Sequence, residues 1–358
     1  MTDLIVDLLD QVEDAVRLVR PLKIVGGGSK LNLLGRDIDK GAHQEIYVGG
    51  HRGIVSYEPS ELVLTARAGT TIAEIESTLA EHDQVLSFEP PQFNGATLGG
   101  SLATNLCGPA RPWRSSFRDM VLGVKLINGR SQHLCFGGEV MKNVAGYDLT
   151  RLQAGALGSL GLITEISLKV LPRLESSKTL VANVEQHESI NLMNQIAGSA
   201  APLTGAVWFD GSLYLRFSGA AKAVRAASSD RKLPSARVLE NDKDFWNHLR
   251  NQTHQFFLVD QPLWRFSIKS SADVLLKDDP CLIDWGGAQR WVFGDFSLEE
   301  LEVLAGKAGG HVCLYRGGDR CGEIRQRLDV IQRNIQQQIK LAIDPEKIFN
   351  PGILYSWM

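Results

Sequence analysis

The sequence predicts an α+β protein with two domains, and three observations support this prediction. A chain of 358 residues is long enough for two domains of ordinary size. Its N-terminal part is rich in strands with a few helices and lacks the regular strand–helix alternation of a parallel sheet. The residue pattern of the sequence then changes around residues 173–180, which indicates a domain boundary. The glycines are also unevenly distributed along the chain, because 21 of the 35 lie within the first 161 residues. That region therefore holds tight turns or a backbone that approaches a ligand closely.

The composition is that of an ordinary globular protein, with 44% hydrophobic and 22% charged residues. A net charge of −3 gives no electrostatic case for binding nucleic acid. No apolar run reaches the roughly 18 residues that a transmembrane helix needs. The acidic, amphipathic start does not resemble a signal peptide, so we expect a cytoplasmic protein. The five scattered cysteines contain no CxxC pair, which favours free thiols and supports no metal site.

In the first domain, apolar spacing predicts a helix over residues 4–19 that Pro21 closes. The pattern from Thr71 to Glu74 is a capping box and predicts a helix that runs to about residue 81. Asn128-Gly129 predicts a hairpin turn between two strands. Short apolar or alternating runs predict the strands, over residues 22–25, 45–48, 61–68, 119–127, 131–136 and 163–171.

The second domain mixes short strands with helices. Helices are expected over residues 242–250 and 297–308, and a last helix over 323–343 ends at Asp344-Pro345. The expected strands cover residues 206–209, 213–217, 263–268 and 290–293.

Three motifs of the first domain could bind a ligand. The first, KIVGGGSKLN over residues 23–32, places consecutive glycines after a strand, where backbone N–H groups can converge on an anion. It is neither a Walker A loop nor a dinucleotide fingerprint. Phosphate binding and a simple turn between strands are both compatible with this loop.

The second motif, GATLGGSLATNLCGPARPW over residues 95–113, sets Gly99-Gly100 before a short helical stretch of small residues. Small side chains let a flat cofactor lie against the backbone, and Asn105 can hydrogen-bond a heterocycle edge. The alternative is a glycine-rich Ω-loop. The third motif covers residues 136–172, where turns at small residues precede a strand. Lys142, Tyr147 and Asp148 are either acid–base groups or residues that fix the loop by hydrogen bonding.

In this order and spacing, the three motifs resemble the FAD-binding domain of the vanillyl-alcohol oxidase type. The strings RPWRSSFRDMVLG, VMKNVAGYDL, DWGGAQRW, RGGDR and FNPG narrow the resemblance to the smaller FAD-binding subunits of bacterial glycolate oxidases. The resemblance covers nearly the whole chain. It implies an FAD-binding domain of two subdomains over residues 1–174, a smaller α+β cap over 175–322, and a C-terminal helix and tail over 323–358 that return to the flavin.

The resemblance also implies which residues bind FAD. The first two glycine-rich segments would contact the phosphates, Gly161 and Ile163 would lie near the adenine, and Asn350 near the isoalloxazine. Some relatives attach FAD covalently through a His in the first loop, where this chain has Ser29 and Lys30, so we expect dissociable FAD. The implied phosphate contacts are Gly26, Gly27, Gly28, Ser29, Lys30, Thr97, Gly99, Gly100, Asn105 and Gly108.

The implied activity is oxidation of glycolate, or of D-lactate, with electrons passed through flavin and an iron–sulfur partner to quinone. The implied partners are a larger FAD subunit and an iron–sulfur subunit, which would hold the chain peripherally on the inner face of the cell membrane.

Oxidation of a 2-hydroxy acid needs a carboxylate clamp and a base. Arginine is the preferred clamp because its fork matches a carboxylate. The second domain offers Arg265, Arg290 and Arg316, and His311 is a candidate base. Each arginine could equally form a structural ion pair.

One departure from the resemblance matters. The larger sister subunit resembles enzymes with a His-bearing HxGDGNxH-like stretch, whereas this chain has HVCLYRGGDR with a single His. Two alternatives therefore stay open: an FAD-loaded relay or assembly subunit whose partner performs catalysis, and a free-standing 2-hydroxy acid dehydrogenase.

Overall fold

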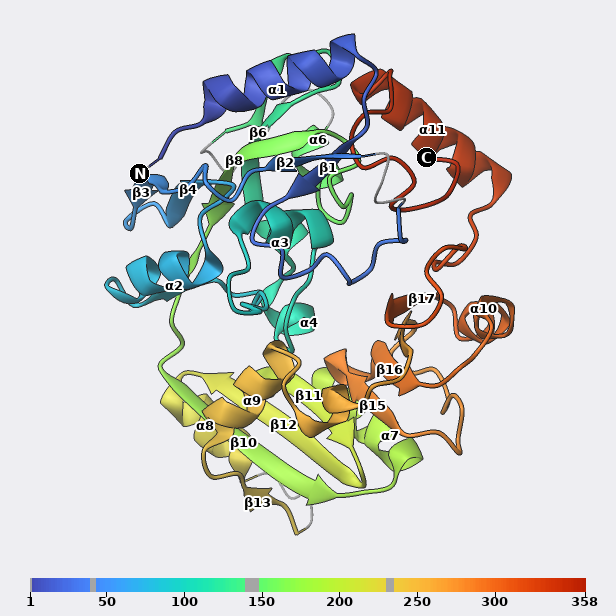
Figure 1. The fold of residues 1–358 in the computed structure, drawn as a ribbon. Coiled ribbons are helices and arrows are strands. Elements are labelled where there is room, and N and C mark those ends of the chain that lie inside the picture. The colour runs from blue at the N-terminus through green and yellow to red at the C-terminus, as the bar shows by residue number, and fades with distance from the viewer. Residues whose placement is uncertain (1, 39–42, 139–147, 230–234) are drawn as a thin grey trace.

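The computed structural model describes residues 2–38, 43–138, 148–229 and 235–358. They form two layered bodies, one above the other in Figure 1, and both chain termini lie in the upper body. The upper body contains a five-stranded sheet and the lower body an eight-stranded sheet. Each sheet is packed against helices, so the predicted α+β class is confirmed.

The five-stranded sheet of the upper body is antiparallel throughout, in the order β3-β4-β8-β6-β7. Its strands are β3 (Ile54–Glu58), β4 (Val63–Arg67), β6 (Val121–Ile127), β7 (His133–Gly137) and β8 (Leu162–Lys169). A separate parallel pair joins β1 (Leu22–Val25) to β2 (Gln44–Tyr47), and β5 (Gln84–Val85) pairs with β9 (Leu171–Pro172).

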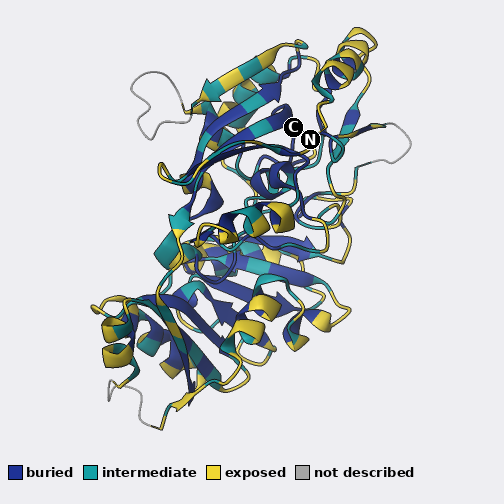
Figure 2. Cartoon of the chain, turned by 90° about the vertical axis from the view of Figure 1, so that its left-hand side faces the viewer, coloured by how far each residue is buried: buried dark blue, intermediate teal, exposed yellow. Residues whose placement is uncertain are grey.

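Helices cover this sheet with the apolar faces that the sequence spacing predicts. From α1 (Ile5–Arg17), Leu8, Val12 and Ala15 enter the same core as Ile72, Ile75 and Leu79 of α2 (Ile72–Ala80). Figure 2 shows the strands largely buried and the helices exposed on their outer faces. The remaining helices are α3 (Leu98–Thr104), α4 (Arg111–Arg114), α5 (Phe117–Met120) and α6 (Leu149–Leu152).

The lower body is one antiparallel sheet in the order β13-β10-β12-β11-β15-β16-β14-β17. Its strands are β10 (Ser176–Asn183), β11 (Leu203–Phe209), β12 (Ser212–Gly219), β13 (Arg237–Val238), β14 (Leu263–Ser267), β15 (Cys281–Asp284), β16 (Gln289–Phe293) and β17 (His311–Arg316). Its helices are α7 (Gln186–Ala197), α8 (Ala221–Ser228), α9 (Asp242–Arg250), α10 (Leu298–Lys307) and two short 3-10 turns, η1 (Gln255–Leu258) and η2 (Trp285–Gly287).

The C-terminal segment returns to the upper body, where α11 (Val330–Ile343) lies in Figure 1. Beyond it, the backbone N–H of Leu22 donates to Ile348 O at 2.6 Å, and that of Asn350 donates to Leu22 O at 2.9 Å. The tail thus lies beside β1, the strand that leads into the first glycine-rich loop.

Two predicted elements begin at other residues in the structure. The last helix starts at Val330 instead of near residue 323, because the segment before it hydrogen-bonds along β17: Leu314 N donates to Ile324 O at 2.8 Å. The strand expected from Asp119 starts at Val121, since Ser116 and Asp119 form a capping box that makes a helical turn first. Several elements of the structure were not predicted at all, among them the strands β3, β10 and β15 and the helices α7 and α8.

No helix in the described part of the chain combines the length and the apolar character needed to cross a membrane.

Candidate functional site: a glycine-lined cavity on the upper body

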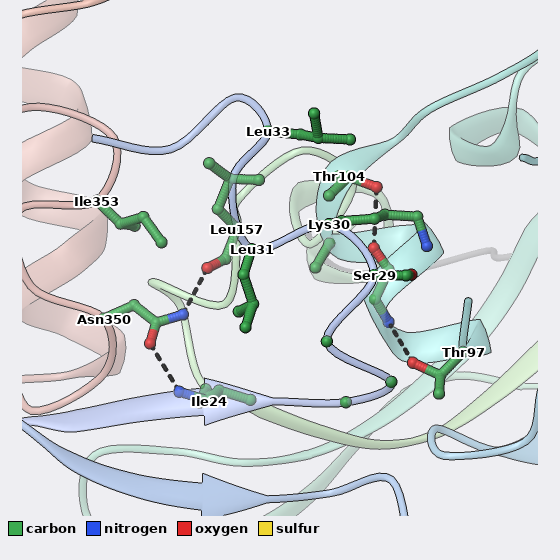
Figure 3. Close-up of a pocket in the computed structure, with 15 residues that line it drawn as sticks. Ile24, Ser29, Lys30, Leu31, Leu33, Thr97, Thr104, Leu157, Asn350 and Ile353 are labelled. Carbon is green, nitrogen blue, oxygen red and sulfur yellow. Dashed lines mark hydrogen bonds between the residues drawn. The ribbon is translucent and has the colours of Figure 1, made fainter. Parts of the chain in front are cut away.

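A cavity with two adjoining lobes opens where the three glycine-rich segments meet (Figure 3). Both lobes share Ile24, Gly26, Thr97, Gly100 and Asn350. Eleven of the thirteen residues expected to bind FAD line this cavity: Gly26, Gly27, Gly28, Ser29, Lys30, Thr97, Gly99, Gly100, Gly161, Ile163 and Asn350.

The first loop follows β1 and presses against the second segment. A Cβ on Gly26 would lie 2.6 Å from Thr97 Oγ1, and one on Gly27 would lie 2.0 Å from Gly95 O. Only glycine allows this approach. Within the described residues, no hydrogen bond is found for the backbone N–H groups of residues 27–30. Because unpaired N–H groups at the edge of a cavity attract an anion, the loop fits a phosphate group.

Helix capping fixes the second segment in place. Thr97 is the N-cap of α3, and its Oγ1 accepts a hydrogen bond from Gly100 N at 3.4 Å. A Cβ on Gly99 would lie 2.8 Å from the Cβ of Ala68, on the chain that follows β4. The small residues of α3 thus leave backbone exposed toward the cavity and pack the helix onto the sheet.

Lys30 is the cation at this cavity. Its Nζ donates to Ser101 Oγ at 3.2 Å. Burial lowers the pKa of Lys30 to about 7, because the charged ammonium loses water and has no carboxylate partner among the described residues. A bound anion would restore the charged form, so Lys30 also fits a phosphate.

Asn350 ties the third segment to the first. Its Oδ1 accepts from Ile24 N at 2.9 Å, and its Nδ2 donates to Leu157 O at 2.7 Å (Figure 3). A Cβ on Gly158 would lie 2.8 Å from that Nδ2. Asn350 therefore holds β1 and the 157–161 turn at a fixed spacing across the cavity.

The remaining two residues expected to bind FAD lie elsewhere. Asn105 ends α3 in the left-handed conformation, with φ of 49°, and its Oδ1 accepts from Arg118 N at 3.3 Å. Gly108 lines a second cavity, between the two bodies, and its carbonyl accepts from Trp285 Nε1 at 3.0 Å.

Strand register divides the substrate-side candidates between two faces of the lower sheet. Arg265 pairs with Trp291 and Cys313, on the face that contacts Leu106 of the upper body. Arg290 pairs with Phe266, on the opposite face. Its buried guanidinium donates to the backbone carbonyls of residues 272, 273 and 287, and burial lowers its pKa to about 10. These bonds give Arg290 a structural role.

The other two candidates lie at the ends of β17. Arg316 donates to Phe257 O at 2.6 Å. His311 begins the strand opposite Ser267 and is solvent-exposed. Partial desolvation, with Arg265 and Arg325 nearby, lowers the pKa of His311. The four candidates are therefore not gathered at one point.

Of the alternatives for the third motif, Lys142 and Tyr147 lie outside the described residues. Asp148 caps α6, accepting from Arg151 N at 3.1 Å, and pairs with the Arg151 guanidinium at 3.2 Å. This bonding matches the loop-fixing alternative for Asp148.

Sequence reasoning missed a buried pair behind the first cavity and two residues that line the second. Lys340 and Asp344 form a buried pair behind Asn350, and Gln289 and Asp284 face the second cavity. A lysine and an aspartate four residues apart on a helix usually lie on its surface, so the sequence carried no signal for their burial.

The comparisons with known proteins agree with the glycine-lined cavity. A family described as FAD binding domain matches residues 5–136, which include the first loop and the second segment. The fold is also that of a solved alkyldihydroxyacetonephosphate synthase, with a TM-score of 0.65 and 17% identity, covering 96% of this chain and 74% of that one. The protein is therefore an FAD-binding protein with the fold of the vanillyl-alcohol oxidase type.

A match over nearly the whole chain identifies the family more narrowly than the fold does. The chain is 41% identical over 350 residues to glycolate oxidase subunit GlcE of Escherichia coli K12, covering 98% of this chain and 97% of that protein. It belongs to this family of glycolate oxidase subunits. It is also 28% identical over 183 residues to glycolate oxidase subunit GlcD of Bacillus subtilis 168, covering 51% of this chain and 39% of that longer protein.

Proposed function

We propose that the chain is the FAD-binding subunit of a glycolate dehydrogenase complex, with FAD held non-covalently in the glycine-lined cavity. The observation that carries the proposal is the meeting of three segments distant in sequence, each with small residues, around unpaired backbone N–H groups and the buried Lys30. Their donors suit a pyrophosphate. The residues present therefore fit FAD.

Each part of the cavity has a role in this proposal. The N–H groups of residues 27–30 and the Lys30 ammonium bind the phosphates, and Gly99 and Gly100 let the cofactor approach the backbone. Gly161 and Ile163 line the lobe proposed for the adenine end. The positions at which some relatives attach FAD covalently hold Ser29 and Lys30, neither of which forms such a bond. When bound, FAD accepts two electrons from the carbon that bears the substrate hydroxyl and releases them singly.

The two sheets support a division into domains, and residues 324–326 still bond to β17 before the chain leaves the lower body. We propose an FAD-binding domain over residues 1–174, a cap over 175–322 and a C-terminal segment over 323–358. Family membership supports partners: a larger FAD subunit related to GlcD and an iron–sulfur subunit that passes electrons toward quinone, with the complex on the cytoplasmic side of the membrane.

A second candidate is an FAD-loaded relay subunit whose larger partner performs catalysis. The observation that favours it is that Arg290 lies on the opposite face of the lower sheet from Arg265, and that Arg290 and Arg316 bond to backbone carbonyls.

The test is glycolate-dependent bleaching of the flavin in this chain, with and without its partner subunits. The proposal expects the purified complex to reduce a dye acceptor with glycolate, and the bleaching to be lost when this chain is omitted. D-lactate in a parallel assay decides between the two acids. Unchanged turnover in a complex that lacks this chain would contradict the proposal. Turnover that needs the chain but is unaffected by Arg265→Gln would favour the relay subunit.

A further inference from the structure

Helix α11 carries an apolar ridge that the rest of the chain covers only in part. Residues spaced four apart lie in one row along a helix. The row consists of four isoleucines: Ile331, Ile335, Ile339 and Ile343. Towards the C-terminus of the helix, Ile339 and Ile343 pack against a small core cluster that includes Leu160. Towards its N-terminus, Ile331 is 68% exposed and Ile335 is 54% exposed, so the ridge extends beyond the part of α11 that the upper body supports.

The N-terminal half of α11 is exposed to solvent. Residues 329–335 are all exposed, and α11 lies at the outer edge of the upper body in Figure 1. Every residue of α11 is described, and its only buried side chain is that of Lys340. Valine and isoleucine are weaker helix formers than glutamine or lysine, because their branched side chains lose rotamer freedom in a helix. Val330, Ile331 and Ile335 therefore neither favour the exposed helix nor bury apolar surface within this chain, which indicates that another surface covers them.

The polar residues beside the exposed half of the ridge are uncharged. They are Gln332, Asn334, Gln336 and Gln338. Arg333 lies on the opposite side of the helix, where its guanidinium stacks on the Trp357 ring at 5.0 Å. The core of a protein–protein interface is depleted of charged residues, whereas an anionic lipid surface favours lysines and arginines beside the apolar row. The ridge therefore suits an apolar face of another protein.

A cavity continues the ridge at its C-terminal end. It has a volume of about 640 Å³ and lies between α11, α6 and the hairpin of β6 and β7. Beside Ile339 and Ile343, its apolar walls comprise Leu126, Leu134, Phe136, Leu149 and Leu152. Gln153 is 1% exposed and lines the same cavity, and among the described residues its Oε1 has no hydrogen-bond partner. Side chains of a helix that follows the ridge would enter this cavity, and a polar one would find an acceptor there.

We propose that this face of α11, together with the cavity beside it, binds the uncharged apolar face of a helix from another subunit of the glycolate dehydrogenase complex. The occupant is a helix because ridges of side chains four residues apart pack into the grooves of a second helix. The proposal rests on the function proposed above and identifies the surface through which the chain joins the complex. Membership of a family of oxidase subunits favours a different chain over a second copy of this one.

The test measures the dissociation constant between the FAD-loaded chain and its purified partner subunits by analytical ultracentrifugation. Ile331→Gln with Ile335→Gln should weaken binding about tenfold or more, because the apolar area buried at the interface is lost. Glutamine is a better helix former than isoleucine, so α11 should stay folded. Ile331→Leu with Ile335→Leu keeps the apolar area and should recover most of the affinity. The control is Val6→Gln with Val303→Gln, at positions 65% and 57% exposed on α1 and α10, which should bind as the unaltered chain does.

Hydrogen exchange provides a second measurement that needs no variant. The backbone amides of residues 330–339 should exchange more slowly in the complex than in the free chain, because the partner helix covers the exposed half of α11. The amides of α1 should exchange at the same rate in both.

Equal affinity in the glutamine variant and the control, or unchanged exchange in α11, would overturn this docking surface and leave the proposed function standing. Two other results would assign the ridge to a different occupant and overturn it as well. One is dimerisation of the chain alone that the glutamine variant loses, and the other is binding to phosphatidylglycerol vesicles that the same variant loses. Failure of the unaltered chain to bind any partner subunit would reject the function proposed above, and this surface with it.

Discussion

At the scale of single residues, ionisation of Lys30 makes FAD binding in the glycine-lined cavity depend on pH. In the FAD-free chain its pKa is lowered to about 7 by burial, so the side chain is charged at pH 6 and neutral at pH 9. A pyrophosphate near the ammonium favours the charged form and raises this pKa. Binding of FAD above pH 7 therefore takes up a proton.

We predict that FAD affinity falls as pH rises above 7, by at most about tenfold per pH unit for this single group. Lys30→Met should bind FAD more weakly at pH 6 and lose most of the slope. The measurement is the dissociation constant of FAD from flavin fluorescence between pH 6 and pH 9. Lys23→Met, which removes a lysine paired with Glu45 at 2.7 Å outside the cavity, should keep the slope. An equal slope in Lys30→Met would contradict the assignment.

A second pH effect concerns the stability of the folded protein and comes from ionisation of the buried Asp284. Burial is the largest cause that raises its pKa from 3.8 to about 7, and the neighbouring Glu89 adds to the shift. The folded protein therefore resists ionisation of Asp284, whereas the unfolded chain ionises near its ordinary pKa. The resulting cost to stability is absent below about pH 4, grows as pH rises, and is complete above about pH 7.

Asp284→Asn should therefore raise the melting temperature at pH 8 and leave it unchanged at pH 4. The asparagine oxygen can still accept a hydrogen bond from Trp285 N. Because the cost of ionising residue 284 is removed, the free energy of unfolding at pH 8 should rise by on the order of 2–4 kcal/mol. Thermal unfolding at the two pH values checks this. The same effect at both values would show that the change does not come from ionisation.

At the scale of elements, α11 determines the position of Asn350. Lys340 is 1% exposed and donates to Asp344 Oδ2 at 2.7 Å, to Ser159 O at 2.7 Å and to Phe349 O at 2.8 Å. Asp344 in turn accepts from the N–H groups of Ile348 and Phe349, at 3.1 and 2.9 Å. One buried pair thus joins α11, the 157–161 turn and the tail.

Lys340→Met should destabilise the protein by about 3–5 kcal/mol, because Asp344 is left as a buried charge without its partner. FAD affinity should fall as well, since Phe349 and Asn350 lose their anchor. Thermal unfolding and FAD titration measure the two effects. Lys347→Met, at an exposed position on the same segment, is the matched control. Normal FAD affinity in a folded Lys340→Met protein would show that the pair does not position the cavity.

Local signals explain which elements the sequence could predict. The Thr71 cap, the apolar face of α1 and the strand before Gly26 are each encoded within a few residues, and the structure contains all three elements. The start of α11 was harder, because residues 324–326 bond to β17, which is distant from α11 in the fold. The N-cap of α11 is Asp329, whose side chain accepts from Gln332 N at 2.8 Å; this was the local signal that could have corrected the start.

At the scale of the whole molecule, the two-domain architecture followed from the chain length and from the change in sequence around residues 173–180. The cofactor class followed from the family resemblance, to which VMKNVAGYDL contributes most and the glycine loop least. Sheet order was not predictable, since the order β11-β15-β16-β14-β17 depends on pairings between distant segments. The placement of the candidate substrate-binding residues depended on that strand order. Arg265 and Arg290 look alike in sequence, and only the pairing of β14 with β16 places them on opposite faces.

The central claim, that the chain holds dissociable FAD in the glycine-lined cavity, is tested most directly by the visible spectrum of the purified chain before and after acid precipitation. The account predicts flavin absorbance in the native chain, reconstituted with FAD if necessary, and release of all of it into the supernatant. Gly27→Val, whose side chain would meet Gly95 O, should abolish the absorbance while thermal unfolding still shows a folded protein. A native chain without flavin absorbance after reconstitution, or flavin that stays with the precipitate, would contradict the account.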